Sequence, residues 1–213
     1  MASDHDVTGY DVTQSRTVYS GRVISLRVDE VRMSDGSVAT RDVVEHPGAV
    51  AVVALDESGR VVTVTQYRHP LKQRLVELPA GLLDVEGEPA LRAAQRELAE
   101  EAGLAADEWH VLLDLFTSPG MCDEAVRIFL ARGLRESDPG FSPEHEELEL
   151  TVERRPLDEL VADALAGRLG NSLAVAGVLA AAHVRDLGLD GARPLGLSAL
   201  RPADAIWLAR PEH

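Results

Sequence analysis

Cysteine is almost absent from this chain of 213 residues, which contains only Cys122. A single cysteine excludes an intrachain disulfide bond and a structural zinc site built from several cysteines. The N-terminal segment MASDHDVTGYD lacks the basic start and the apolar core of a signal peptide. No apolar run approaches the roughly 18 residues that a membrane helix needs. We therefore expect a cytoplasmic protein that has no membrane partner.

Basic residues are also scarce. The chain has 21 Lys and Arg against 36 Asp and Glu, which gives a formal net charge of −15. Such a charge repels anionic membranes and the phosphate backbone of nucleic acids, so neither is expected as a partner. An acidic protein can still bind a small phosphate compound, but it then needs local arginines or bridging metal ions.

The length and an apolar content of 45% suit one large domain, or a core domain with a smaller unit attached. Residues 17–47 contain two runs typical of strands, TVYSGRVISLRVDEVRM and VATRDVVEH, around the turn sequence SDGS. Pro47 and Gly48 then interrupt the pattern. We predict a loose segment at 1–16, a small N-terminal antiparallel β unit at 17–47, a main domain at 48–187 and an irregular extension at 188–213.

The main domain alternates strand and helix patterns. Strands are predicted at 49–56, 61–68, 74–81, 110–118, 124–134 and 148–155, and helices at 89–102, 157–167 and 171–187. Interleaving of this kind indicates an α/β fold in which helices cover both faces of a mixed sheet.

The helix predicted at 89–102 is crowded with acidic residues. The apolar stripe that should face the sheet consists of Leu91, Ala94, Leu98 and Ala102. Glu88 lies four residues before Arg92, so these two side chains suit a surface ion pair. Arg96 and Glu100 have the same spacing, and ordinary ion pairing therefore accounts for two of the glutamates.

Glu97 and Glu101 are not explained in this way. They are four residues apart on the other flank of the helix, where their neighbours are mainly alanine and leucine. An unpaired carboxylate beside the apolar stripe is costly because that border is poorly solvated. A divalent cation with oxygen ligands would offset the cost. Spacing alone leaves two interpretations open, a solvated acidic face and a metal site.

A longer pattern surrounds this helix. Gly81 and Glu88 precede the run RELAEEAGL at 96–104. Together they resemble the signature box of the Nudix hydrolases, which is a glycine, a glutamate after a short loop, seven residues, and R-E-U-x-E-E-x-G-U, where U is a bulky aliphatic residue. Six residues separate Gly81 from Glu88, one more than the box usually has, and this departure weakens any role carried over to Glu88.

The resemblance implies a Nudix-type α/β/α sandwich that hydrolyses a nucleoside diphosphate linked to another group. It implies Mg²⁺ as the cofactor, with Mn²⁺ able to substitute. The implied metal ligands are Glu97, Glu101, Glu100 and the backbone carbonyl of Ala80, while Arg96 would orient the glutamates. Arg96 and Glu100 therefore count as catalytic residues. Mg²⁺ suits such a site because it binds through a few carboxylates together with substrate phosphates.

Other landmarks resemble the ADP-ribose pyrophosphatase subfamily of these hydrolases. Pro119 lies 15 residues beyond Leu104, the end of the box, and a proline at about this offset marks the subfamily. The segments TRDVVEHPGAVAVVALD, QYRHP, ELPAGLLD and SPGMCDE are similar to its successive motifs. The resemblance implies cleavage of ADP-ribose to AMP and ribose 5-phosphate by a homodimer, with the N-terminal strands packed across the dimer.

Residue by residue, the same resemblance assigns substrate contacts. Arg41 and Arg68 would contact the diphosphate or the adenine, Val23 and Ile24 would line the adenine pocket, and Glu124 would hold a sugar or a water molecule. Two plainer interpretations stay open. The arginines suit exposed strand positions, and the two aliphatic residues equally suit a core.

The general base is expected from the acidic loop SPEHEELEL at 142–150, since the resembling enzymes take their base from a mobile loop at this place. Alignment on the following strand makes Glu146 the base, with Glu147 as the alternative. Cys122 lies beside the substrate loop but is not assigned a catalytic role.

Two other functions remain open. One is hydrolysis of another nucleoside diphosphate sugar, such as GDP-mannose or ADP-glucose. The other is a catalytically silent module that binds ADP-ribose. The intact set of Arg96 and the glutamates at 97, 100 and 101 favours an enzyme, because a silent module has no need of metal ligands.

Overall fold

The computed structural model describes residues 10–137, 150–188 and 200–207. By its internal contacts the chain forms two compact units, which are described separately below. The first unit comprises residues 1–48 and 116–124, and the second comprises residues 49–115 and 125–213. Among the described residues, no helix combines the length and apolar character needed to cross a membrane.

The first unit is an antiparallel sheet of three strands, β1 Asp11–Ser20, β2 Ser25–Arg32 and β3 Val38–Glu45, in that order. The turn predicted at SDGS joins β2 to β3, and Gly36 within it adopts a left-handed φ of 85°. Segment 116–124 joins β3 through hydrogen bonds from the Val44 amide to the Met121 carbonyl (2.8 Å) and from the Asp123 amide to the Val44 carbonyl (3.1 Å).

The second unit contains two sheets. The larger has five strands in the order β11-β8-β9-β4-β7, with bounds Arg201–Pro202, Leu104–Phe116, Ala125–Glu136, Ala49–Ala54 and Ala80–Leu82. Strand β4 runs parallel to β9 and antiparallel to β7, so the sheet is mixed. The smaller sheet has the order β10-β5-β6, with bounds Thr151–Pro156, Arg60–Arg68 and Gln73–Glu77.

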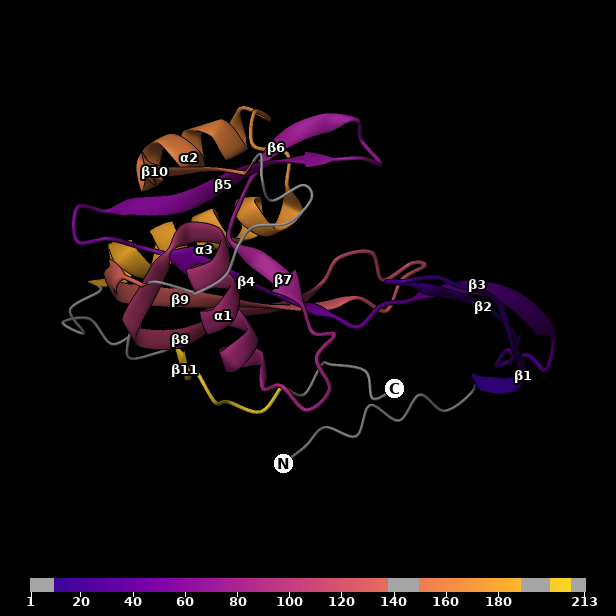
Figure 1. Ribbon diagram of the computed structural model, residues 1–213. Helices are drawn as coiled ribbons and strands as arrows, with labels where there is room; N and C mark the ends of the chain where they lie inside the picture. The colour runs from indigo at the N-terminus through magenta and orange to yellow at the C-terminus, as the bar shows by residue number, and fades with distance from the viewer. Residues whose placement is uncertain (1–9, 138–149, 189–199, 208–213) are drawn as a thin grey trace. The chain divides into compact units, whose positions relative to one another are not determined.

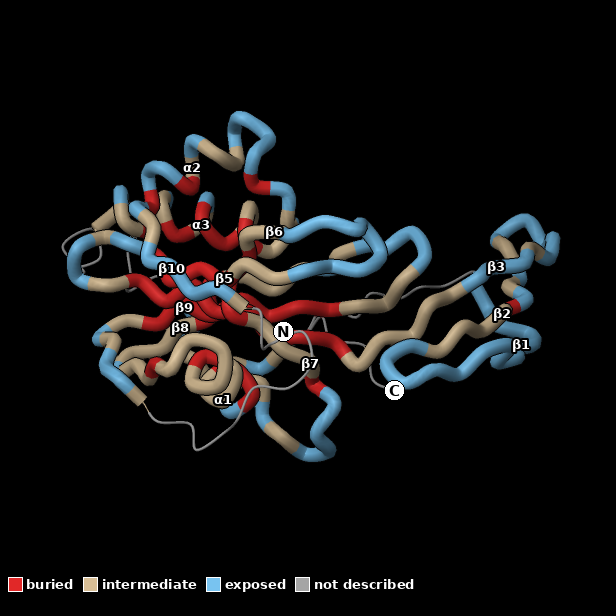
Figure 2. Tube along the Cα trace, turned by 45° about the horizontal axis from the view of Figure 1, so that its top comes forward, coloured by how far each residue is buried: buried red, intermediate tan, exposed pale blue. Residues whose placement is uncertain are grey.

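Helices cover both faces of the five-stranded sheet (Figure 1). Every residue of β4 is buried, as expected for a continuous apolar strand covered on both sides. Its Val50 and Val52 pack toward α1 (Ala90–Ala102), and its Ala51 and Val53 pack toward α3 (Ser172–Gly188). Helix α2 (Leu157–Leu165) packs on the α3 side. Figure 2 shows β1 exposed along its whole length, whereas the buried residues gather in the strands between α1 and α3. The predicted α/β/α sandwich with a small antiparallel unit is confirmed.

Several predicted elements differ in detail. Strand β1 begins at Asp11, so residues 11–16 belong to the sheet and not to the loose segment predicted at 1–16. The run TVYSGRVISLRVDEVRM contains the end of β1 and the whole of β2, with a turn between them at 21–24. The strand predicted at 74–81 is two strands, β6 and β7, in different sheets. Pro79 lies between them and cannot donate a backbone hydrogen bond, so the ladder of β6 ends there. Strand β8 begins at Leu104, six residues before the prediction, because its polar start LAADEW hides the strand pattern.

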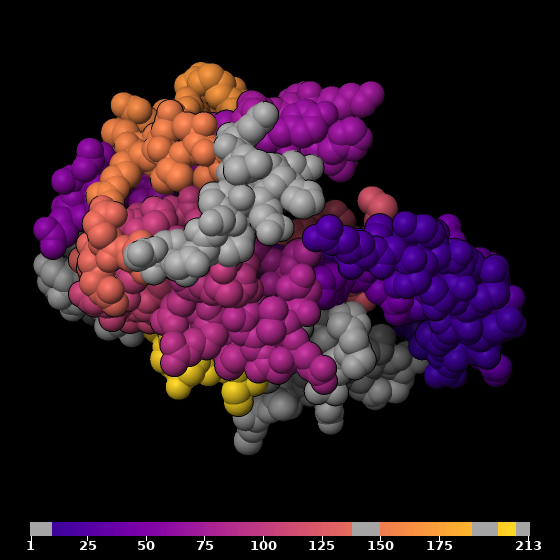
Figure 3. All heavy atoms as spheres, in the orientation of Figure 1, coloured from indigo at the N-terminus to yellow at the C-terminus, as the bar shows by residue number. Residues whose placement is uncertain are grey.

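The extension predicted to be irregular contains a short ordered segment. Strand β11 pairs with β8 at Val111 and His110, and Figure 3 shows this yellow segment against the magenta residues of the second unit. Arg127, whose side chain is 4% exposed, holds it in place. Its guanidinium donates to both carboxylate oxygens of Asp114 (2.7 and 2.9 Å) and to the carbonyl of Ala205 (2.6 Å). It also lies 4.8 Å from the ring centroid of Trp207.

Asp114 completes this network by accepting a second ion pair, from Arg201 at 2.6 Å. Burial opposes ionisation of Asp114, but the hydrogen bonds from Arg127 and Arg201 outweigh burial and lower the pKa of this carboxyl. Its ion pairs therefore stabilise the fold above the ordinary aspartate pKa, and the contribution is lost as the pH falls through the lowered value.

We predict that Asp114→Ala lowers the free energy of unfolding by about 3 kcal/mol, because the change leaves a buried guanidinium without its carboxylate. Urea unfolding at neutral pH measures the difference. The control is Asp186→Asn, which removes an exposed ion pair to Arg185 and should leave the midpoint unchanged. Equal midpoints for the two variants would show that the network does not hold the C-terminal segment.

Candidate active site

Helix α1 carries the acidic residues and has a well-defined beginning and end. Pro89 precedes its first turn, and Gly103 ends it in the left-handed conformation at φ 64°, where its amide donates to the Ala99 carbonyl. The buried residues of the helix are Ala93, Ala94 and Leu98. Leu91 and Ala102, predicted in the same stripe, are partly buried against the same core. The opposite flank therefore presents the glutamates.

Arg96 is the centre of this acidic group. Its guanidinium donates to both oxygens of Glu88 (3.2 and 3.0 Å), to Glu97 (2.6 Å) and to Glu100 (3.1 Å). The pKa of Arg96 is raised, mainly by the hydrogen bond to Glu88 and further by the charge of Glu97. One cation thus gathers three carboxylates and offsets their mutual repulsion.

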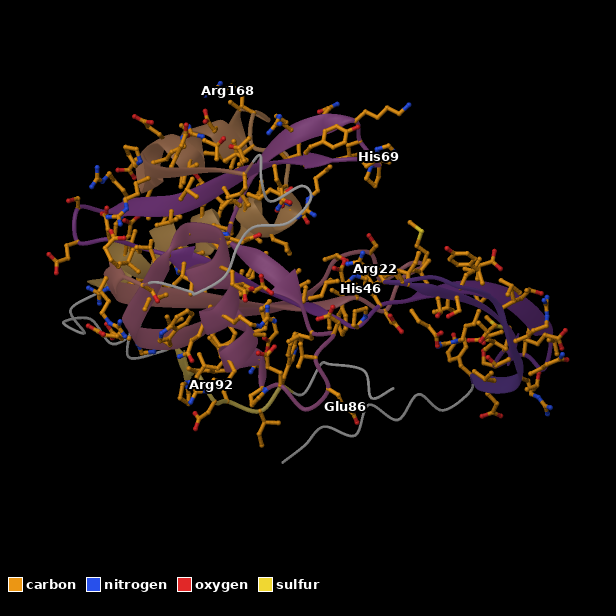
Figure 4. All side chains as sticks on the ribbon, viewed as in Figure 1. Arg22, His46, His69, Glu86, Arg92 and Arg168 are labelled. Atoms are coloured by element: carbon orange, nitrogen blue, oxygen red, sulfur yellow. The ribbon has the colours of Figure 1, made fainter. Side chains whose placement is uncertain are left out.

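The ion pair predicted between Arg96 and Glu100 is present, but two other expectations from the helical wheel are wrong. Glu97 was expected to lack a partner, but it bonds to the adjacent Arg96. Glu88 bonds to Arg96 instead of Arg92, whose guanidinium donates to the Gln95 amide oxygen at 3.1 Å. The wheel misses both contacts because it ignores the length of the arginine side chain and the loop that brings Glu88 back toward the helix. Figure 4 shows Glu86 in that loop and Arg92 on the helix.

Strand β7 contacts two of the glutamates of α1, Glu97 and Glu101. The amide of Ala80 donates to Glu101 Oε2 at 2.9 Å. Gly81 lies so close to Glu97 that a Cβ atom at this position would be 2.0 Å from the Glu97 carboxylate. The absence of a side chain at Gly81 therefore creates the space that the Glu97 carboxylate occupies. Glu97 and Glu101 meet the same short strand at successive residues.

These residues suit a hard divalent cation by their chemistry, since the donors are carboxylate oxygens and one of them is held by a backbone amide. The side chains of Glu97 and Glu100 are 14% and 25% exposed, so both still reach solvent. No group of three or more His, Cys, Asp or Glu in the described part of the chain is already arranged around a metal position. An ion bound here would need further ligands from water or phosphate, which is how Mg²⁺ is usually held.

Arg68, a predicted substrate residue, lies at the end of β5 and forms a two-pronged ion pair with Glu77. Its Nε and one terminal nitrogen donate to the two oxygens of Glu77 at 2.9 and 2.6 Å. The Glu77 side chain is 2% exposed, whereas that of Arg68 is 44% exposed. His69, the next residue, occupies the outer end of the β5–β6 hairpin (Figure 4).

Glu77 is a residue that the sequence analysis missed. The sequence does contain a sign of it, because Glu77 is a charged residue within the apolar run RLVELPAG. A strand that is buried on both faces is ordinarily apolar throughout.

The first unit holds the other predicted substrate residues. Arg41 is exposed on β3 and donates to the Thr40 carbonyl at 2.8 Å. Val23 and Ile24 lie between β1 and β2 and are 43% and 38% exposed, which contradicts the alternative that they belong to a core. Glu124 accepts a short hydrogen bond from the Thr117 hydroxyl.

His46 and Cys122 lie near Glu124 in the first unit. Oε1 of Glu124 lies 3.7 Å from Nδ1 of His46, a nitrogen that also accepts a hydrogen bond from the Gly48 amide. No motif in the sequence assigns a role to His46. Cys122 lies two residues before Glu124 in the chain, and burial raises the pKa of its thiol, which does not favour a reactive thiolate. The predicted base Glu146, and its alternative Glu147, lie outside the described residues.

Comparisons with known proteins agree with this geometry. A family model of the NUDIX domain matches residues 45–174, and a model of the nucleoside diphosphate sugar hydrolase N-terminal domain matches residues 11–44. The chain is 46% identical over 211 residues to an ADP-ribose pyrophosphatase of Mycobacterium tuberculosis, an alignment that covers 98% of this chain and 95% of that protein. It is 41% identical over 142 residues to an ADP-ribose pyrophosphatase of Bacillus subtilis, covering 67% and 69%.

A solved structure shares the fold. The crystal structure of an ADP compounds hydrolase matches with a TM-score of 0.71 and 22% identity, covering 84% of this chain and 96% of that one. The family model extends over more than half of the chain, and the mycobacterial relative aligns with nearly all of it. The glutamates gathered by Arg96, the two domain matches and the shared sandwich thus lead to one assignment: the chain belongs to the Nudix hydrolase family.

Proposed function

We propose that this protein hydrolyses the diphosphate of ADP-ribose, or a related ADP-sugar, to AMP and a sugar phosphate. The observation that carries the proposal is the 46% identity to an ADP-ribose pyrophosphatase over 98% of the chain. The match to the N-terminal domain of nucleoside diphosphate sugar hydrolases supports the same substrate class. The chain also has all the glutamates of the Nudix box, Glu88, Glu97, Glu100 and Glu101.

Within this proposal Glu97, Glu101, Glu100 and the carbonyl of Ala80 hold Mg²⁺, for which Mn²⁺ can substitute. The bound ion would neutralise the diphosphate, polarise phosphorus and lower the pKa of the attacking water. Arg96 keeps Glu97 and Glu100 together before the ion arrives, and its hydrogen bonds to them set their orientation. Glu88 acts on the same arginine from the loop, and is not itself assigned to the metal.

The remaining roles follow the motifs. Arg68 and Arg41 bind the diphosphate or the adenine, Val23 and Ile24 line the adenine pocket, and Glu124 holds a sugar hydroxyl or water. The exposure of Val23 and Ile24 supports a contact with something outside the described chain. Glu146 serves as the base that takes a proton from the attacking water. Glu146→Gln should lower kcat with little change in KM. If Glu147→Gln lowers kcat instead, Glu147 is the base.

We further propose a cytoplasmic homodimer in which residues 17–47 contribute to dimerisation and substrate binding. Strand β1 is exposed along its whole length and carries large apolar side chains, which a monomer rarely leaves in water. The apolar residues exposed on or beside it are Tyr10, Val12, Val18 and Tyr19. Light scattering of the purified protein, with and without Tyr19→Ser, tests the assembly.

The substrate is tested with a panel of ADP-ribose, ADP-glucose and GDP-mannose, in which a phosphatase releases phosphate from the products, with and without Mg²⁺. We expect the highest kcat/KM for ADP-ribose and no turnover after chelation. A preference for GDP-mannose would show that the protein hydrolyses a diphosphate but that ADP-ribose is not its substrate. Binding of ADP-ribose without turnover on any compound would identify a silent module instead.

We predict that Glu97→Gln and Glu101→Gln each lower kcat at least about a hundredfold, because a bound metal ion supplies several kcal/mol of transition-state stabilisation. Circular dichroism should show both variants folded, since glutamine has nearly the same size and shape as glutamate and neither residue belongs to the buried apolar face of α1. Glu86→Gln, an exposed change in the neighbouring loop, serves as the control and should retain full activity. Unchanged turnover in both glutamate variants would remove the metal assignment.

We predict that Gly81→Ala lowers kcat by about tenfold or more, because the new methyl group must displace the Glu97 carboxylate and small misplacements of reacting groups are costly. The melting temperature should fall little, since the atoms in contact are the end of a flexible side chain. Gly170→Ala adds the same methyl group where no atom lies within 4 Å. Equal activity of the two variants would contradict the proposed role of the Gly81 contact.

A further inference from the structure

Glu77 is a buried acidic residue that the proposed chemistry does not use. Its side chain is 2% exposed, and it is the last residue of β6, followed in the chain by the buried Leu78. Moving a carboxylate out of water costs several kcal/mol even after the protein relaxes. An apolar residue of similar size at this position would avoid that cost. The charge of Glu77 therefore calls for an explanation other than stability.

The main partner of Glu77 is unusually exposed for so buried an acid, and a weaker hydrogen bond comes from the Gln66 amide nitrogen at 3.5 Å. Both carboxylate oxygens accept hydrogen bonds from Arg68, whose side chain is 44% exposed. A pairing through two oxygens fixes the plane of the guanidinium as well as its position. A free arginine side chain carries about 2 kcal/mol of rotamer entropy, which binding would otherwise have to remove. Glu77 thus holds a partly exposed cation in one orientation in advance.

The segment that begins at Glu77 also positions the carboxylates of α1. Leu78 is buried, the Pro79 carbonyl accepts from the Val52 amide at 2.9 Å, and the Ala80 amide donates to Glu101. Gly81 is in contact range of Glu97. Five consecutive residues therefore connect the two sheets, with Arg68 fixed at their first residue and the glutamates at their last two. This connector, residues 77–81, has little freedom to change length or direction.

We propose that Glu77 is a positioning residue for the anionic substrate: it orients Arg68 toward the diphosphate at a set place relative to the glutamates of α1. The inference rests on the proposed function and deepens it by assigning how one cation of the site is held. Arg68 touches the substrate in this scheme, and Glu77 acts only through Arg68. The net charge of −15 repels a diphosphate, so the protein needs a fixed cation to bind one. Arg68, held in one orientation, can supply that cation.

The test compares Glu77→Gln, Arg68→Lys and the double variant with the unaltered protein. Asp56→Asn is the matched control, since Asp56 is 9% exposed and pairs with an arginine, Arg60, that is 46% exposed at the opposite end of β5. Two quantities are measured in Mg²⁺, the Kd for ADP by calorimetry and the kcat and KM for ADP-ribose. ADP reports on diphosphate binding without requiring turnover.

We expect Glu77→Gln to raise the Kd for ADP and the KM for ADP-ribose about tenfold or more, with a smaller effect on kcat, because the orienting partner is lost. Arg68→Lys keeps the charge but not the two-pronged pairing, and should do the same. The double variant should be no worse than Arg68→Lys alone, because Glu77 acts through that side chain. Asp56→Asn should lower only the melting temperature.

The proposal fails if Glu77→Gln behaves like Asp56→Asn, with lower stability and unchanged Kd and KM. It also fails if the effects of the two single variants multiply in the double variant. Glu77→Met, which fills the same volume without charge, provides a second variant if Glu77→Gln does not fold, and the same rise in Kd is expected. If the unaltered protein binds ADP in a Glu77-dependent way but does not cleave ADP-ribose, the proposed function fails and the inference stands.

Discussion

The candidate active site depends on one guanidinium surrounded by carboxylates. Without Arg96, the glutamates at 88, 97 and 100 would repel one another across a short stretch of helix and loop. With it, they form a compact group whose charge is partly balanced and whose oxygens remain near solvent. The rest of the second unit serves this arrangement, since β4 is buried beneath α1 and Gly81 leaves room for the Glu97 carboxylate. The same guanidinium thus makes the acidic helix stable and keeps it suited to a cation.

The connector at 77–81 links the two sheets of the second unit. Its first residue belongs to β6 in the smaller sheet, and Ala80 and Gly81 belong to β7 in the larger one. A cationic side chain and a set of acidic ones are therefore built on different layers but share one short piece of backbone. Pro79 is well placed within it, because its missing amide makes no demand on either sheet, while its carbonyl bonds to β4.

Much of this could be predicted from the sequence, and the failures have identifiable causes. Helix α1 was predicted within one residue because Gly103 ends it and its apolar stripe has a clear helical period. The box from Glu88 to Leu104 identified the family because its residues are close together in the chain.

The partner of Glu97 was missed because a helical wheel describes directions and not side-chain reach. The ion pair of Arg68 and Glu77 joins two strands, and periodicity within one strand says nothing about such a contact. The ordered segment at 201–207 was missed for the same reason, since Arg127 lies far from it in the chain.

That last separation has a consequence for how the protein is made. Arg127 and the Ala205 carbonyl it bonds to are 78 residues apart, and domains of a growing chain tend to fold from the N-terminal side during synthesis. A nascent chain that has completed β9 already carries the guanidinium at the sheet, together with Asp114, but not the carbonyl groups or the indole that finally cover it. The edge of the larger sheet beside β8 therefore stays open through the synthesis of α2 and α3. Pairing of β11 with β8 has to wait until the last residues of the chain have been made.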